Sequence, residues 1–459
     1  MKNKKYEIDM CSGAILPKML KFSIPLMCSS ILQLLFNAAD IVVVGRFAGD
    51  NSLAAVGSTS SLINLLTNLF IGLSIGGNVL AARYYGAKNE DDLSKTVHTS
   101  MLLSVISGLI LTIVGLLGAR TILTWMKTPP EVLNLAVLYL RIYFLGMTAT
   151  MIYNFGSAIL RAVGDTRRPL YYLSISGIVN VVLNMFFVIV FHMDVAGVAI
   201  ATVISQCISA FLVVRCMIHE EGGIRLDFKQ LHIYKDKLVQ IFKIGLPAGF
   251  QGILFSLSNV VIQSSVNTFG STIVAGNSAA NNLEGFVYVG MNAFYQATLS
   301  FTSQNVGAGN VKRIRKILIT GLLCVTVVGT LLGNATYFAG STLLSLYSTT
   351  PEVIEAGLLR LSILASTYAL CGMMDVMVGG LRGIGYSVMP MIVSLVGACG
   401  LRLLWVSTIF QIEKFHTVRV IYFSYPISWL VTFLIHVICY RLVIKKKEKV
   451  IEMKLGTTL

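Results

Sequence analysis

Long apolar runs alternate with short polar segments along nearly the whole chain. Twelve of these runs reach the roughly 20 residues that an α-helix needs to cross the hydrocarbon core of a bilayer. They lie at 18–44, 52–80, 95–119, 132–158, 170–192, 194–218, 238–263, 272–302, 314–338, 352–379, 388–411 and 419–443. This pattern predicts an all-α integral membrane protein with twelve transmembrane helices.

The longest polar stretch, 219–243, separates two sets of six runs, and motifs of the first set recur in the second. The recurring residues, each 221 positions apart, are Leu160, Arg161, Gly164 and Pro169 with Leu381, Arg382, Gly385 and Pro390. Two further motifs recur at the same offset, at 130–132 and at 86–89. The halves are therefore copies. An even number of helices in each copy makes the repeat parallel, an arrangement that transporters use.

We divide the chain accordingly into a cytoplasmic N-terminus (1–17), a first lobe (18–218), a linker (219–237), a second lobe (238–443) and a basic cytoplasmic tail (444–459). The Gly-x-x-x-x-Pro segments that begin at Gly164 and Gly385 are expected to be short turns between helices, because glycine and proline end one helix and start the next.

Charge is scarce but strongly asymmetric. Charged residues make up 12% of the chain and the formal net charge is +15. With both termini inside, 28 of the 36 Lys and Arg residues lie on the cytoplasmic side and 5 on the outer side. This distribution follows the positive-inside rule. Attraction to anionic lipid explains the basic balance, so no nucleic-acid partner is needed.

One acidic residue stands out within the first apolar run. Asp40 is costly to place in hydrocarbon, so it is expected to face the bundle interior or an aqueous cavity. Asn180 and Asn184 share one helix face, and with Thr202 they reach a similar depth in the outer half of the membrane. Such an oxygen-rich cluster suits Na+, or a proton carried by Asp40. The asparagines can instead be interhelical hydrogen bonders that stabilise the bundle.

The second half lacks this cluster but has polar groups of its own. Glu284, Asp375 and Arg402 are its intramembrane charges, and Asn154 is the first-half counterpart of Asp375. Either acid can bind a cationic substrate, whereas Asp375 and Arg402 can instead form a structural ion pair.

Two other features of the apolar runs are less specific. Asn259 and Gln263 belong to a polar stripe that is expected to face a central cleft or to make interhelical contacts. Arg141 and Arg360 are expected to snorkel, without a functional role.

Catalytic signatures are absent from the sequence. There is no His-Glu-x-x-His, no Gly-x-Ser-x-Gly and no P-loop. The sequence therefore predicts a protein that is not an enzyme and needs no cofactor, with its energy supplied by an ion gradient or by the gradient of its substrate.

Several features together resemble the multidrug and toxic compound extrusion (MATE) family. They are the duplicated halves, Pro25, Asp40 and Gly45 of the first helix, the stretch at 160–169, and Asn180-x-x-x-Asn184 followed by 197–202. The resemblance covers roughly 15–443. It implies a V-shaped bundle of two lobes and an antiporter that exports amphipathic organic cations in exchange for Na+ or H+.

The resemblance also assigns roles to individual residues. A family cation site in the first lobe falls on Asp40, Asn180, Asn184 and Thr202, with Asn184 in the place of a family aspartate. An acidic site of one family branch matches Asp375, but its glutamate in the seventh helix has no counterpart here, and Glu284 is a candidate substitute.

We expect a monomer in a bacterial plasma (inner) membrane, surrounded by lipid, with both termini cytoplasmic. The alternative function is a flippase for lipid-linked precursors, from the same superfamily. Such a flippase is expected to line its cleft with several basic residues, and here only Arg402 qualifies.

Overall fold

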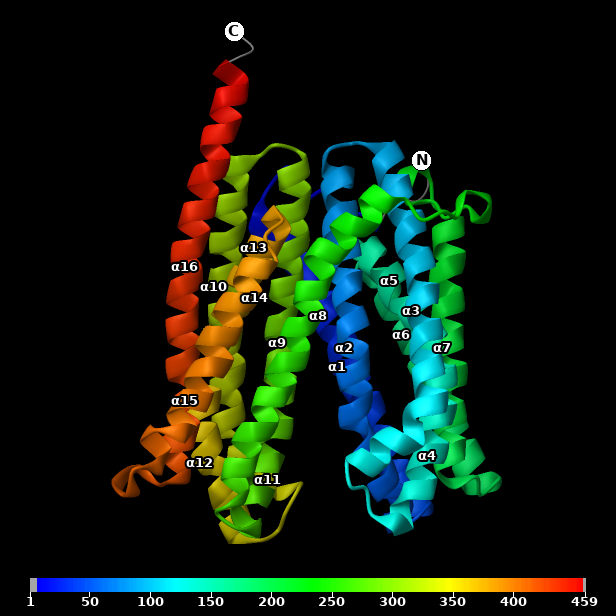
Figure 1. The fold of residues 1–459 in the computed structure, drawn as a ribbon, viewed down its shortest axis with the longest axis vertical. Coiled ribbons are helices and arrows are strands. Elements are labelled where there is room, and N and C mark those ends of the chain that lie inside the picture. Colours follow the sequence, from blue (N-terminus) through cyan, green and yellow to red (C-terminus); the bar gives the residue numbers. More distant parts are fainter. Residues whose placement is uncertain (1–5, 457–459) are drawn as a thin grey trace. The chain divides into compact units, whose positions relative to one another are not determined.

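The computed structural model describes residues 6–456, which contain helices but no strands (Figure 1). The helices of the first half are α1 (Ile15–Phe47), α2 (Asp50–Gly86), α3 (Glu90–Trp125), α4 (Pro130–Leu145), α5 (Met147–Ala162), α6 (Arg167–Met185) and α7 (Asp194–Ile218). Those of the second half are α8 (Lys235–Asn267), α9 (Ser271–Gly307), α10 (Val311–Phe338), α11 (Gly340–Ser345), α12 (Pro351–Thr367), α13 (Ala369–Ile384), α14 (Val388–Ser394), α15 (Leu401–Ser407) and α16 (Val418–Gly456). Residues 1–5 of the expected N-terminus and 457–459 of the expected tail lie outside the described residues.

Every predicted apolar run coincides with helix, which confirms the predicted fold class, but two runs are sharply bent. The runs at 132–158 and 352–379 are each split into a pair, α4 with α5 and α12 with α13, bent by 47° and 43°. At each bend the backbone N–H of Gly146 or Tyr368 bonds to a carbonyl three residues earlier, at 3.1 and 3.4 Å. These tighter turns interrupt the α-helical ladder and redirect the axis.

By length and composition, nine helices within residues 6–456 can span a membrane, and the two bent pairs bring the total to eleven. Helix α9 is the one predicted span that is not among them. Its first half carries Asn277, Asn281, Asn282 and Glu284, which lower its hydropathy. This helix is held by polar contacts inside the protein, as shown below.

The internal duplication is visible in the elements themselves. α2 and α9 are both 37 residues long, and α1 and α8 are both 33 residues long with an internal proline. The predicted turns at Gly164 and Gly385 are confirmed, and both glycines have positive φ, at 94° and 112°. An L-residue with a side chain strains in this conformation, which explains why glycine stands at both positions.

Two compact units divide the described chain. Residues 6–10 and 24–252 belong to unit 1, and residues 11–23 and 253–456 belong to unit 2. Helices α1 and α8 therefore each contribute residues to both units. The Asp40 cluster lies within unit 1, and Glu284, Asp375 and Arg402 lie within unit 2.

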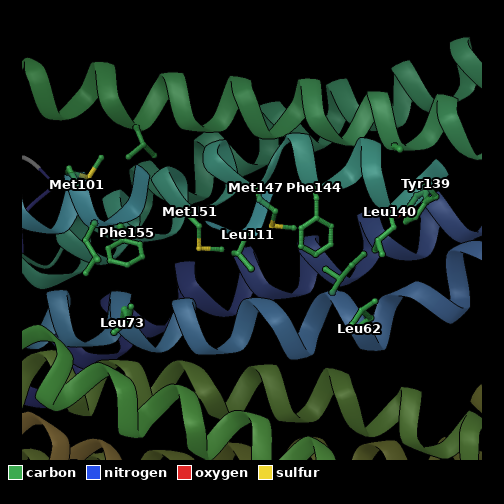
Figure 2. Packing of buried hydrophobic residues seen from close by; sticks show 14 of the residues in the cluster. Leu62, Leu73, Met101, Leu111, Tyr139, Leu140, Phe144, Met147, Met151 and Phe155 are labelled. Carbon is green, nitrogen blue, oxygen red and sulfur yellow. The ribbon is translucent and has the colours of Figure 1, made fainter. Parts of the chain in front are cut away.

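The interior of unit 1 is filled by large apolar side chains (Figure 2). Phe144 and Phe155 are among its fully buried residues, and Met147 and Met151 fill the space between them. The ring of Phe144 lies directly against Gly115 of α3, where a methyl group would overlap with it. This interlocking holds the bent pair α4 and α5 against α3.

Small residues bring α2 and the first part of α8 into backbone contact. A Cβ at Gly72 would overlap with the backbone of Gly249, and one at Gly76 would overlap with the carbonyl of Ile241. Close approach through glycines four residues apart is a common way to join membrane helices, because backbone atoms then pack directly.

We expect Gly72→Leu to destabilise the protein, because overpacking a helix contact costs about 1–3 kcal/mol or more when the neighbouring atoms are backbone. Gly57 provides a matched control in the same helix, since nothing lies within 4 Å of a Cβ there. The measurement is the thermal midpoint of the purified protein in detergent. A midpoint of Gly72→Leu equal to that of Gly57→Leu would contradict the contact.

Candidate functional site

A close contact between α1 and α6 positions the candidate ion site of unit 1. Gly177 of α6 lies against the ring of Phe36 of α1, and a Cβ at Gly177 would overlap with that ring. Asp40 follows Phe36 by one helical turn, and Asn184 follows Gly177 by about two turns. The two side chains therefore meet along the same seam.

Hydrogen bonds join the four predicted residues into one chain. The Asn184 amide donates to the carboxylate of Asp40 and, over 3.3 Å, to Oδ1 of Asn180. Nδ2 of Asn180 in turn lies 3.4 Å from Oγ1 of Thr202 on α7. The prediction that these residues come together is thus confirmed.

The cluster is buried but not fully satisfied. Asn184 has no exposed surface and Asn180 is 5% exposed, whereas Asp40 is half-buried. Oδ1 of Asn184 is buried without a hydrogen-bond partner in the described chain. An unsatisfied buried acceptor is unfavourable by itself, so this oxygen is suited to receive a cation or a proton donor.

Two further features surround this cluster. Tyr139 and Tyr143 of α4 lie close enough to the Asp40 carboxyl to interact with its charge. Immediately after α6 the chain forms a π-helix, η1 (Phe186–Val190), two residues beyond Asn184. Such π-turns are frequent at functional sites because they change the direction of nearby side chains.

In unit 2 the prediction for Arg360 was wrong. This arginine does not snorkel: it is 5% exposed and pairs with Glu284, its Nε and Nη2 lying 2.9 and 2.7 Å from the two carboxylate oxygens. It also donates to Asn277 over 2.8 Å and to Asn281 over 3.2 Å. Snorkelling is unnecessary because every edge of the guanidinium is bound inside the protein.

The possible ion pair between Asp375 and Arg402 is not formed. No salt bridge within residues 6–456 includes either residue. Arg402 donates instead to Oγ of Ser428 over 2.8 Å. Asp375 interacts with Tyr288 of α9 and with the charge of Arg382. The expected pair is absent because Arg402 is occupied on α16 by a hydroxyl and aromatic rings.

The predicted polar stripe of α8 is only partly used. Gln263 donates to Asn267 over 2.9 Å and accepts from Asn277 over 2.8 Å, so it extends the Arg360 network. Asn259 is exposed. In unit 1, Asn154 donates to the carbonyl of Thr150 in its own helix over 2.9 Å and takes no part in the Asp40 cluster.

Sequence reasoning did not predict the Arg360 network. Besides Arg360 itself, Asn277 and Tyr422 belong to it, the hydroxyl of Tyr422 lying 3.1 Å from Oδ1 of Asn277. The available signal was the polar run that begins at Asn277 on α9, because a helix too polar for lipid must find its partners on a neighbouring helix.

Known proteins resemble this chain over most of its length. The MatE family model matches residues 25–187 and 247–406, one segment in each half. The chain is 28% identical to the probable multidrug resistance protein YoeA of Bacillus subtilis, over 93% of this chain and 94% of the relative. It is also 25% identical to the FAD transporter of Shewanella oneidensis, over 73% and 75%.

Solved structures share the fold. An outward-facing multidrug resistance MATE transporter of the MOP superfamily aligns with a TM-score of 0.91 at 22% identity, covering 98% of this chain and 100% of that one. The fold and the family match together define a helical membrane transporter, not an enzyme. The matched segments occupy both halves of the chain, and the protein belongs to the MatE family.

Proposed function

We propose that the protein is a secondary antiporter that exports amphipathic organic cations across a bacterial plasma membrane in exchange for Na+ or H+. It works as a monomer with both termini cytoplasmic and with the lobes 18–218 and 238–443 as its moving parts. The names of its relatives support export of foreign compounds, since YoeA is called a multidrug resistance protein.

The observation that carries this proposal is the Asp40 cluster. A single carboxylate is hydrogen-bonded to Asn184, whose own Oδ1 has no partner among the described residues. Asp40, Asn180, Asn184 and Thr202 together offer four oxygen-bearing side chains and one negative charge, which suits one hard monovalent cation or one proton. Ion binding would draw these oxygens together and shift α1 along its contact with α6.

In this proposal the positive charge of the substrate is bound by Asp375. This carboxylate has no ion pair within residues 6–456, whereas Glu284 is already neutralised by Arg360. Glu284 therefore has a structural role, and Asp375 is the one of these two acids that forms no ion pair among the described residues. The same pairing weakens the flippase alternative, because it removes Arg360 from the cations available for a pyrophosphate.

Efflux of a fluorescent organic cation from reconstituted vesicles tests the proposal. Na+ and H+ gradients are imposed one at a time, and an inward gradient of the coupling ion is expected to drive outward movement of the dye. Reversing the gradient should reverse the flux. A dye flux that ignores both gradients would refute ion-coupled antiport, and transport of a lipid-linked pyrophosphate instead would support the flippase.

A further inference from the structure

The guanidinium of Arg402 is held by side chains of α16 inside unit 2. Arg402 follows the π-helix η4 (Leu395–Gly400) by two residues, at the start of α15, and is 3% exposed. Its guanidinium lies 4.2 Å from the ring centroid of Tyr425 and 5.5 Å from that of Trp429, both on α16. With Nε bound to Ser428, the plane of the guanidinium is fixed by α16.

The charge of Arg402 is not compensated. Nη2 is buried without a hydrogen-bond partner, and no carboxylate of the described chain forms an ion pair with this arginine. Arg360, which also lies over Tyr425, shows the contrast: it binds two carboxylate oxygens and two amide oxygens. An unpaired buried charge is strongly unfavourable, and intramembrane ones commonly mark functional sites.

We propose that Arg402 binds an oxyanion, a carboxylate or phosphate group, of the transported molecule. A guanidinium presents paired N–H donors in a fixed fork that matches the two oxygens of such a group. Tyr425 and Trp429 lie against the guanidinium, and its Nη2 remains the buried donor that an oxyanion would satisfy. The same rings provide an aromatic wall for the apolar part of the ligand.

The inference rests on the proposed function and refines its substrate class. Asp375 and Arg402 are charges of opposite sign in unit 2, and neither forms an ion pair among residues 6–456. A molecule with a positive group for Asp375 and an oxyanion for Arg402 neutralises both. The favoured substrates are therefore aromatic molecules that carry an oxyanion in addition to their positive charge.

A matched pair of dyes tests this assignment. A rhodamine with a free carboxylate and its methyl ester share one positively charged chromophore and differ only in the anionic group. Efflux of each is measured with wild-type protein and Arg402→Gln in vesicles. We expect the substitution to lower acid-dye transport at least tenfold and to change ester transport less than about twofold, as for a lost charge-assisted hydrogen bond.

Fluorescence anisotropy measures the binding of the same dyes to the purified protein. This measurement needs no ion gradient, so it tests the role of Arg402 independently of ion coupling. Wild type should bind the acid more tightly than the ester, and Arg402→Gln should remove that difference. Riboflavin phosphate and riboflavin form a second pair, which shows whether phosphate or carboxylate is preferred.

The outcomes are distinguishable. Equal losses for acid and ester in Arg402→Gln, with a lowered thermal midpoint, would show that Arg402 is structural and overturn the assignment. Ester efflux that ignores both ion gradients would refute the antiporter but leave the binding comparison decisive. Ser428→Ala is the control for positioning: it should weaken acid binding less than Arg402→Gln, because the fork itself remains.

Discussion

Replacing Asp40 with asparagine is expected to abolish ion-driven efflux, lowering its initial rate by about a hundredfold or more. The change removes the one charge of the cluster that can attract Na+ or hold a proton, and about 2.7 kcal/mol of lost interaction corresponds to a hundredfold in rate. Asparagine has nearly the same shape and still accepts a hydrogen bond from Asn184, so the fold should be retained.

The measurement is dye efflux from vesicles under an imposed Na+ or H+ gradient, with the protein content of the vesicles matched. Asp194→Asn is the control, because it removes an exposed acid of the same unit by the same chemical change. Asp40→Glu should keep partial activity, since the charge is retained at a displaced position. Efflux by Asp40→Asn at the wild-type rate would exclude Asp40 as the coupling group.

The second large effect is expected from the buried pair of Glu284 and Arg360. Arg360→Met leaves the Glu284 carboxylate buried without its partner, and Glu284→Met does the same to the guanidinium. Each single change should destabilise the protein by about 3–5 kcal/mol, whereas the double variant removes both charges and should recover much of this loss. The thermal midpoints of the four proteins in detergent give the comparison.

A double variant whose loss equals the sum of the two single losses would show that the residues act independently and that the pair contributes no coupling. Tyr422→Phe is a milder probe of the same network. It removes the hydroxyl that binds Asn277 over 3.1 Å and leaves the ring in place over Arg360, at 5.6 Å.

The sequence predicted the helices and the repeat because apolar length and duplicated motifs are properties of the chain itself. It also predicted the meeting of Asp40, Asn180, Asn184 and Thr202, since topology sets depth and a four-residue spacing sets a shared face. The shared face acts along one helix, whereas depth relates helices that are far apart in sequence, as for Asp40 and Asn184, which are 144 residues apart. These two constraints suffice when the residues of a site lie on sequentially adjacent helices or at one defined depth.

The partner of Glu284 could not be predicted in this way. Arg360 lies 76 residues away, and Arg402 is another base in the same half of the chain. The choice between them depends on how α12 and α15 are rotated about their axes. A helix that is apolar on nearly every side has no single apolar face from which its rotation could be predicted. The bend between α12 and α13 could not be predicted from the sequence either. It arises from a single tightened turn at Tyr368, and such a turn does not interrupt the apolar run from which the helix was predicted.

The lone carboxylate of the Asp40 cluster also limits the energetics of transport under the proposed function. One monovalent ion inward for one monovalent cation outward moves no net charge, so the membrane potential does no work. A tenfold ion gradient, about 1.4 kcal/mol, then sustains at most about a tenfold substrate gradient. A substrate whose oxyanion cancels its positive charge makes the same exchange electrogenic. Each 100 mV of inside-negative potential then adds about 2.3 kcal/mol and raises the attainable gradient about fiftyfold.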